Sequence, residues 1–79
     1  MTPYKNLNGD SNVVAFQLND QAITVKFREP SKSGYDTYVY SESSAGSYHV
    51  EQMKQLAVAG SGLNGYINEN VREKYESRS

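Results

Sequence analysis

The sequence predicts an α+β domain in which a three-stranded antiparallel sheet is followed by two helices packed on one face of that sheet. In the first half of the chain, apolar and polar residues alternate as they do in strands. In the last third, apolar residues recur at every fourth position, which is typical of an amphipathic helix. Because strands precede helices in a chain of 79 residues, we expect a single domain over residues 1–79, with the helices on one side of the sheet.

The first residues of the chain offer little for a core. Residues 1–12 are rich in Asn, Gly and Asp, and only Tyr4 and Leu7 are suited to packing, so we expect a loose N-terminal arm. Residues 13–18 then predict the first strand by their apolar content.

The second strand, over residues 23–28, has the cleanest alternation in the chain. Asn19 and Asp20 precede it, and both tolerate the positive φ of a tight hairpin turn. Ile23, Val25 and Phe27 share one face of this strand, and Thr24, Lys26 and Arg28 share the other.

The third strand is expected over residues 35–40, after a Pro- and Gly-containing loop at 29–34. Tyr38 and Tyr40, two positions apart, lie on the same face of this strand. If that face is the apolar one, the two rings are core. If it is the face of the basic residues, the sheet shows two rings beside two cations, as in sheet-based RNA modules. Aromatic residues in small domains are more often core, which favours the first alternative by about two to one.

Two helices complete the predicted fold. Residues 41–46 form a small-residue linker, Ser47 is a plausible N-cap, and residues 48–59 form a helix that Gly60 ends. A second helix follows Gly62, with Ser61 or Asn64 available as its cap. Its packing stripe consists of Leu63, Ile67, Val71 and Tyr75. Residues 76–79 are expected to fray.

Composition restricts the classes of function. The chain has no cysteine, no signal peptide is expected, and no apolar run is long enough to span a membrane, so we expect a cytoplasmic location. Eight Lys and Arg residues against nine Asp and Glu residues give a net charge of −1, whereas nucleic-acid binders are usually strongly basic. Seven tyrosines suit either a small amphipathic core or a contact surface.

No set of residues predicts catalysis. Gly60, Gly62 and Gly65 form a G-x-G-x-x-G, but a helix precedes it, so a helix–helix turn explains it better than a dinucleotide site. A residual alternative is one anion bound by free N–H groups at the start of the second helix. His49 is the only histidine and is expected on the surface. We therefore expect no enzyme, no metal and no cofactor.

The polar side of the last helix carries Asn68 and Arg72. Ordinary side-chain pairs on a helix surface explain most of this face but do not settle the role of these two residues. The functional alternative is a modest basic patch of Arg72, Lys74 and Arg78, which would hold phosphates weakly and in a salt-sensitive way.

Several of these residues form a pattern that resembles the KTSC domain family. The strand ending in Thr37-Tyr38-Val39-Tyr40 is similar to that family's central Tyr-x-Tyr. The run from Gly62 to Asn68, followed by Val71-Arg72 and Tyr75, is similar to its C-terminal signature. The resemblance covers roughly residues 11–75. The family occurs at the C-terminus of some lysyl-tRNA synthetases and as small stand-alone bacterial or phage proteins, and RNA binding has been suggested for it. Tyr38, Tyr40, Tyr66, Asn68 and Arg72 are the residues that match.

Together these observations lead to two functional hypotheses for a non-catalytic domain. The first is a weak RNA-binding module for tRNA or single-stranded RNA. Its candidate residues are Lys26, Arg28, Tyr38, Tyr40, Tyr66, Asn68, Arg72 and Lys74. The alternative is a protein-interaction module that uses exposed tyrosines and sheet edges, as a monomer or a weak homodimer.

Overall fold

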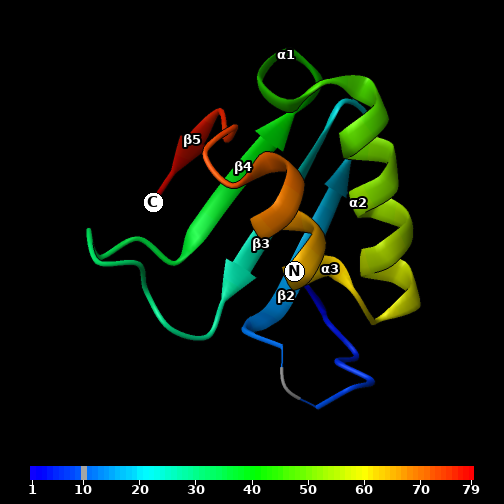
Figure 1. Cartoon of the computed structure of the whole chain (residues 1–79), viewed down its shortest axis with the longest axis vertical. Helices are drawn as coiled ribbons and strands as arrows, with labels where there is room; N and C mark the ends of the chain where they lie inside the picture. Colours follow the sequence, from blue (N-terminus) through cyan, green and yellow to red (C-terminus); the bar gives the residue numbers. More distant parts are fainter. Residues whose placement is uncertain (10) are drawn as a thin grey trace.

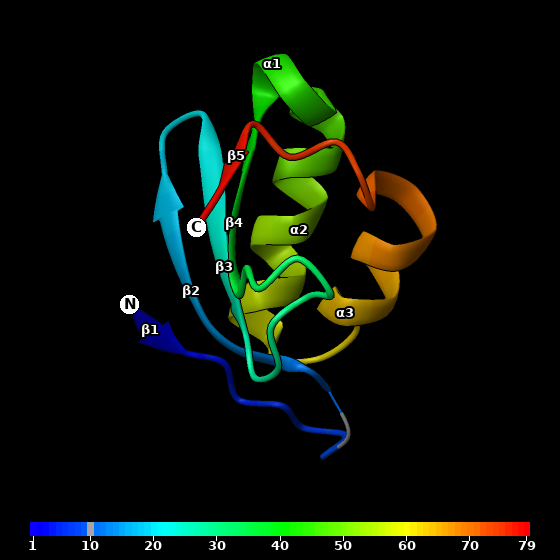
Figure 2. The same ribbon diagram turned by 90° about the vertical axis from the view of Figure 1, so that its left-hand side faces the viewer.

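The computed structural model, which describes residues 1–9 and 11–79, confirms a compact α+β fold with an antiparallel sheet (Figure 1). Within the described residues the sheet has five strands rather than three, in the order β1-β2-β3-β4-β5. The strands are β1 (Thr2–Pro3), β2 (Val13–Asn19), β3 (Ala22–Phe27), β4 (Thr37–Ser41) and β5 (Ser77–Arg78). The helices are α1 (Glu42–Ala45), α2 (Ser47–Ala59), α3 (Leu63–Tyr66) and the π-helix η1 (Ile67–Val71). When the sheet is seen on edge, α2, α3 and η1 all lie on one side of it (Figure 2).

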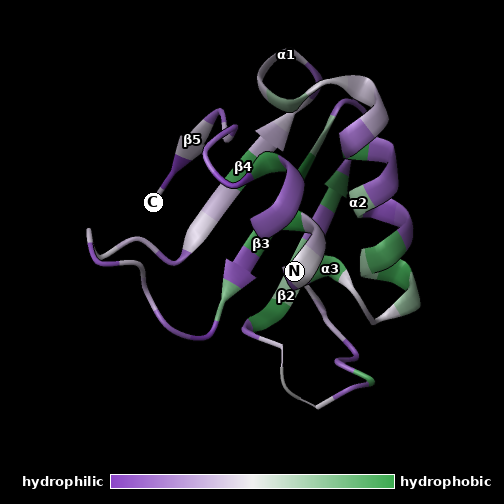
Figure 3. Cartoon of the chain, in the orientation of Figure 1, coloured by the Kyte–Doolittle hydropathy of each residue, from purple (hydrophilic) through white to green (hydrophobic). Residues whose placement is uncertain are grey.

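The three predicted strands form the centre of the sheet. β2 and β3 pair through a hairpin whose turn residues are Asp20 and Gln21, one position later than expected, because Asn19 pairs with Ala22. Hydrophobic residues concentrate on β2, β3 and the C-terminal half of α2 (Figure 3). The prediction of which β3 side chains face the core is confirmed, since Ile23 and Val25 are fully buried and Phe27 is partly buried against the core.

The two edge strands correct the predicted sheet. The N-terminal arm is not loose at its start: Thr2 and Pro3 pair with β2, and Tyr4 is buried. Residue 10 of that predicted arm lies outside the described residues. At the other end, residues 76–79 do not fray, because β5 pairs with β4 and the Ser79 N–H donates to the Thr37 carbonyl at 2.8 Å. Two-residue strands are too short to show any alternation, so periodicity gave no sign of them.

The expected linker at 41–46 contains the short helix α1. Ser41 Oγ accepts from the Ser44 N–H at 3.2 Å, and Ser44 Oγ accepts from the Ser41 N–H at 3.1 Å. This reciprocal pair is a capping box with serine in the position where Glu or Gln is usual. Helix α2 then begins at Ser47, and its N-cap is Gly46 instead of Ser47, with no side-chain cap.

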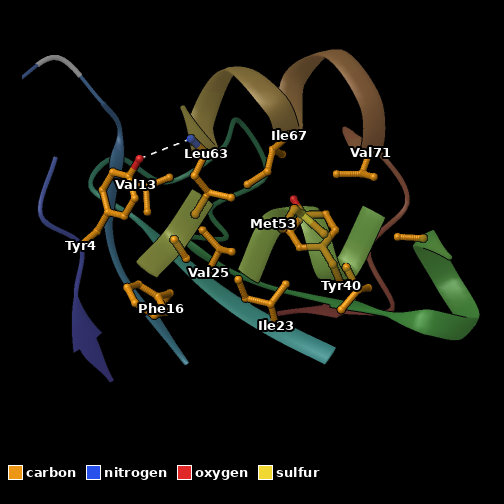
Figure 4. Close-up of a cluster of buried hydrophobic side chains, with 13 residues drawn as sticks. Tyr4, Val13, Phe16, Ile23, Val25, Tyr40, Met53, Leu63, Ile67 and Val71 are labelled. Carbon is orange, nitrogen blue, oxygen red and sulfur yellow. Dashed lines mark hydrogen bonds between the residues drawn. The ribbon is translucent and has the colours of Figure 1, made fainter. Parts of the chain in front are cut away.

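The last helical segment is shorter than predicted. The stripe of Leu63, Ile67 and Val71 is buried as expected, but η1 ends at Val71, so Tyr75 lies beyond the helix. Neither predicted cap is used, because the N-cap is Gly62 without a side-chain hydrogen bond. The Leu63 N–H donates instead to the Tyr4 hydroxyl at 3.3 Å (Figure 4). That contact also engages one of the N–H groups that the anion-site alternative needs.

Of the G-x-G-x-x-G glycines, the first two form the helix–helix turn, as predicted from the helix that precedes them. Gly60 ends α2 with a φ of 82°, and Gly62 has a φ of 84° just before α3. Gly65 lies inside α3. Positive φ values are costly for other residues, so the first two glycines shape the turn. Among the described residues, no helix is long and apolar enough to cross a membrane.

Candidate functional site

A cleft of about 420 Å³ opens beside the core, between the sheet and the last helical segment. β3 and β4 supply one wall, and α3, η1 and the chain that leads from η1 to β5 supply the other. In Figure 1, η1 is seen in front of the sheet near β4, and the chain then returns to β5, whereas the view of Figure 2 shows that η1 and β4 stand apart. The cleft brings together four residues predicted as candidates: Tyr38, Tyr40, Asn68 and Arg72.

The aromatic rings in the cleft pack on one another. The Tyr38 ring centre lies 5.6 Å from that of Phe27 and 5.1 Å from that of Tyr75, both in edge-to-face geometry. Tyr40 stacks nearly parallel to Tyr38 at 6.4 Å. Edge-to-face and offset contacts are the favourable arrangements for such rings. The cleft therefore has a wall of packed aromatic rings that continues into the core.

Sheet register decides which face carries the two tyrosines of β4. Tyr40 is opposite Ile23 and Tyr38 is opposite Val25, so both rings lie on the core face. Tyr40 is 1% exposed, whereas Tyr38 is half-buried and packs against the core from its margin. The favoured alternative is confirmed for Tyr40, which is a core residue, and in part for Tyr38, which lies on the core face at the margin of the core. The open sheet face with two rings beside two cations does not form.

Burial raises the pKa of the Tyr40 hydroxyl, with further contributions from Tyr38 and Tyr75. Tyr40 is therefore a neutral phenol throughout the physiological pH range. Since Tyr40 also lines the cleft, it presents a group that both donates and accepts hydrogen bonds.

Polar side chains from several segments form the rest of the cleft. Asn68 and Arg72 come from η1 and the residue after it, and both are exposed. Asn64 joins them from α3, and Asn12 joins from the position just before β2, where its Oδ1 accepts the Glu29 N–H at 3.2 Å. Carboxamide groups can donate and accept hydrogen bonds and guanidinium groups can donate them, so together they can bind the polar atoms of a ligand.

The π-helical turn of η1 is an unusual element at this wall. In an α-helix the Tyr66 carbonyl would accept from the backbone N–H of Asn70. Here it accepts a hydrogen bond from the side-chain amide of Asn70 at 3.1 Å. Single π-turns occur frequently at functional sites, and this one precedes Arg72.

Arg78 completes the cleft from β5. Its guanidinium carbon lies 4.4 Å from the centre of the Tyr35 ring and 5.1 Å from that of Tyr75. Of the predicted basic patch, Arg72 and Arg78 line the cleft, while Lys74 is an exposed residue after η1 that does not line it.

The remaining predicted residues lie elsewhere. Lys26 pairs with Ala15 and Thr37 on the sheet face opposite the core, and Arg28 is exposed just after β3. Neither is among the described residues that line the cleft. Because neighbouring residues of a strand point to opposite faces, these cations and the rings of β4 are separated by the sheet itself.

Tyr66 belongs to a different cluster. Its hydroxyl lies 2.6 Å from Nδ1 of His49, and the His49 ring lies 5.5 Å from the ring of Tyr48. Desolvation, then the neighbouring Tyr48, raises the pKa of Tyr66. His49 is half-buried instead of fully exposed, because it packs between two aromatic rings. Tyr66 is thus held by a contact outside the cleft.

The cleft residues that sequence reasoning did not select are mainly Phe27, Tyr75, Asn12 and Asn64. Phe27 and Tyr75 were assigned to packing alone, and the two asparagines come from segments read as arm and cap. Phe27 and Tyr75 reach the cleft because both rings pack against Tyr38, and no sequence pattern predicts that the two asparagines lie beside these rings.

Comparison of the chain with protein-family models, curated proteins and solved structures finds no match. Membership of the KTSC family stays a prediction. Among the described residues, no group of three or more His, Cys, Asp or Glu side chains could hold a metal ion.

Proposed function

We propose that this domain is a non-catalytic module that binds single-stranded RNA weakly, through the cleft between β4 and η1. The observation that carries the proposal is the convergence of Arg72, Arg78 and Asn68 on a cleft walled by aromatic rings. RNA-binding proteins recognise unpaired bases by stacking them on aromatic or guanidinium planes and by hydrogen-bonding their edges.

The mode of binding that we propose differs from the one expected for an open sheet. Tyr38 and Tyr40 are on the covered face, so they cannot offer a row of rings to successive bases. Small-molecule pockets typically have volumes of about 300–1,000 Å³. At about 420 Å³ the cleft suits one nucleotide rather than a longer run of bases.

The charge of the chain determines how strongly we expect it to bind RNA. The net charge is −1, and the cations of the cleft are two arginines beside one carboxylate, Glu73. Affinity for RNA comes largely from phosphate contacts and falls with salt. We therefore expect dissociation constants in the micromolar range or weaker, measurable at low salt.

The test is RNA binding at 50 and 200 mM salt, with an unpaired oligoribonucleotide and a tRNA. The wild-type chain should bind the oligoribonucleotide at low salt and bind it more weakly at high salt. Arg72→Ala should weaken binding. Lys54→Ala, which removes a positive charge from α2 where its Nζ donates to the Asp20 carbonyl, is the matched control and should not. Absence of binding by the wild-type chain at low salt would sink the proposal.

A second candidate function is supported by a separate surface. Leu18 and Val58 are 43% and 56% exposed, and they line an apolar hollow of about 430 Å³ with Ala59 and the stems of Lys54 and Gln55. Exposed apolar surface of this kind suits the contact of another protein. Val58→Lys should abolish binding of a purified protein partner and leave RNA binding intact.

The sheet edges bear on the oligomeric state. Since β1 and β5 have only two residues each, strand addition at the sheet edges offers little pairing, and we propose a monomer.

A further inference from the structure

Arg78 is placed in the cleft by the strand that carries it. β5 pairs with β4 so that Arg78 is directly opposite Tyr38. The Glu76 N–H donates to the Val39 carbonyl at 2.6 Å, and the Ser79 N–H donates to the Thr37 carbonyl at 2.8 Å. Hydrogen bonds on both sides of Arg78 therefore fix where its side chain leaves the backbone.

Two rings then hold the guanidinium group. Its carbon lies within cation–π distance of both Tyr35 and Tyr75, at 4.4 and 5.1 Å from the ring centres. Energetically significant cation–π contacts occur about once per 70–80 residues, so two on one arginine of a 79-residue chain exceed the usual frequency. A guanidinium group that stacks on a ring through its planar face keeps the N–H donors of its edge for a ligand.

Arg78 and Arg72 approach the same cleft from different segments. Arg72 follows η1, Arg78 lies on β5, and both residues are exposed at the cleft together with Glu73. Two guanidinium groups and one carboxylate give the cleft a formal charge of about +1. That charge complements one monoanionic group, and guanidinium edges match the oxygen atoms of a phosphate.

We infer that Arg78 is a second phosphate-binding residue of the cleft, and that the ligand is one unpaired nucleotide within an RNA chain, held with Arg72 through its phosphodiester. This inference rests on the proposed function and specifies its ligand. The phosphodiester carries one negative charge, whereas a terminal phosphate carries nearly two at neutral pH. The aromatic wall and the asparagine side chains are left for the base.

The salt dependence of binding tests the inference directly. For single strands, log K falls with log[salt] with a slope of about −0.7 per phosphate contact. With two contacts, the wild-type affinity should fall about sevenfold between 50 and 200 mM salt. Arg78→Ala should bind about tenfold more weakly at low salt and lose only about threefold over the same range.

Two further variants separate a ligand contact from a structural role. Arg78→Lys keeps the charge but not the planar fork, so it should keep the wild-type salt slope at lower affinity. Tyr35→Ala removes one stacking ring and should weaken binding while the slope stays. Thermal unfolding of each variant shows that the fold persists, and Arg78→Lys keeps the test valid if Arg78→Ala does not fold.

The outcomes are distinct for the two proposals. If the wild-type chain binds the oligoribonucleotide and a folded Arg78→Ala variant matches it in Kd and slope, the inference fails while the proposed function stands. A folded Arg78→Lys variant with the lower slope of a lost contact also overturns it. Binding of a nucleoside monophosphate as tightly as the oligoribonucleotide overturns the phosphodiester assignment. Failure of the wild-type chain to bind any RNA overturns the proposed function itself.

Discussion

The hydroxyl group of Tyr4 accepts a hydrogen bond from the backbone N–H of Leu63, 59 positions further along the chain, at 3.3 Å. Tyr4 is 7% exposed and Leu63 is fully buried. The first N–H of a helix has no partner within that helix, and leaving such a group buried and unpaired costs about 1–3 kcal/mol. The contact thus joins the N-terminal segment to α3 and caps it from outside.

This contact gives the first prediction. Tyr4→Phe should lower the free energy of unfolding by about 1–3 kcal/mol, because the ring stays but the Leu63 N–H loses its acceptor. Chemical denaturation of both proteins measures the difference. Tyr48→Phe is the control, since Tyr48 is 70% exposed and its loss of a hydroxyl should change stability by less than about 0.5 kcal/mol. Equal stability of wild type and Tyr4→Phe would show that the hydrogen bond contributes nothing.

The two glycines Gly60 and Gly65 should respond to alanine in opposite ways. Gly60 has a φ of 82°, and a Cβ added there would lie 2.6 Å from Cβ of Lys5. Gly60→Ala should therefore destabilise the fold by on the order of 2 kcal/mol or more. Gly65 lies inside α3 with nothing within 4 Å of an added Cβ, so Gly65→Ala should be stabilising by up to about 1 kcal/mol. Denaturant midpoints of the two variants check the sign of each change in stability. A loss of stability in Gly65→Ala would contradict the assignment of Gly65 to an unobstructed position inside α3.

The burial of Tyr40 predicts a loss of stability at alkaline pH. Burial raises the pKa of Tyr40 in the folded protein above its unfolded value of about 10. Folding therefore favours the neutral phenol, and this contribution is fully present below pH ~10 and is lost as the pH rises through the folded-state pKa. Unfolding free energies measured from pH 8 to 11 should fall above pH ~10 in the wild-type chain and fall less in Tyr40→Phe. Identical pH profiles for the two proteins would remove Tyr40 as the cause.

The parts of the fold that could be predicted are those with a repeating pattern. The alternation of Ile23, Val25 and Phe27 predicted the core face of β3, and the spacing of Leu63, Ile67 and Val71 predicted the buried side of α3 and η1. The edge strands and α1 could not be predicted in this way. Two residues show no period, and Ser41 and Ser44 form their capping box with a serine where the usual signal is Glu or Gln.

The candidate site was predictable only in pieces. Tyr38, Tyr40, Asn68 and Arg72 were all candidates, but no sequence pattern predicted that they line one cleft. Their proximity depends on sheet register and on the π-turn of η1. Register also placed the tyrosines and Lys26 on opposite faces. A one-residue shift of β4 would have exchanged the faces, which is why the sequence left both alternatives open.

That separation by the sheet leads to the last prediction, which distinguishes the cleft from the open sheet face as the RNA site. Lys26 and Arg28 are exposed, and Lys26 lies on the face opposite the core, so the double variant Lys26→Ala/Arg28→Ala removes two cations without touching the cleft. If RNA binds in the cleft, this variant should keep the wild-type salt slope, whereas Arg72→Ala should lower it by about 0.7. Fluorescence anisotropy with a labelled oligoribonucleotide at several salt concentrations gives both slopes. A large loss of slope in the double variant, with Arg72→Ala unaffected, would move the RNA site to the opposite face.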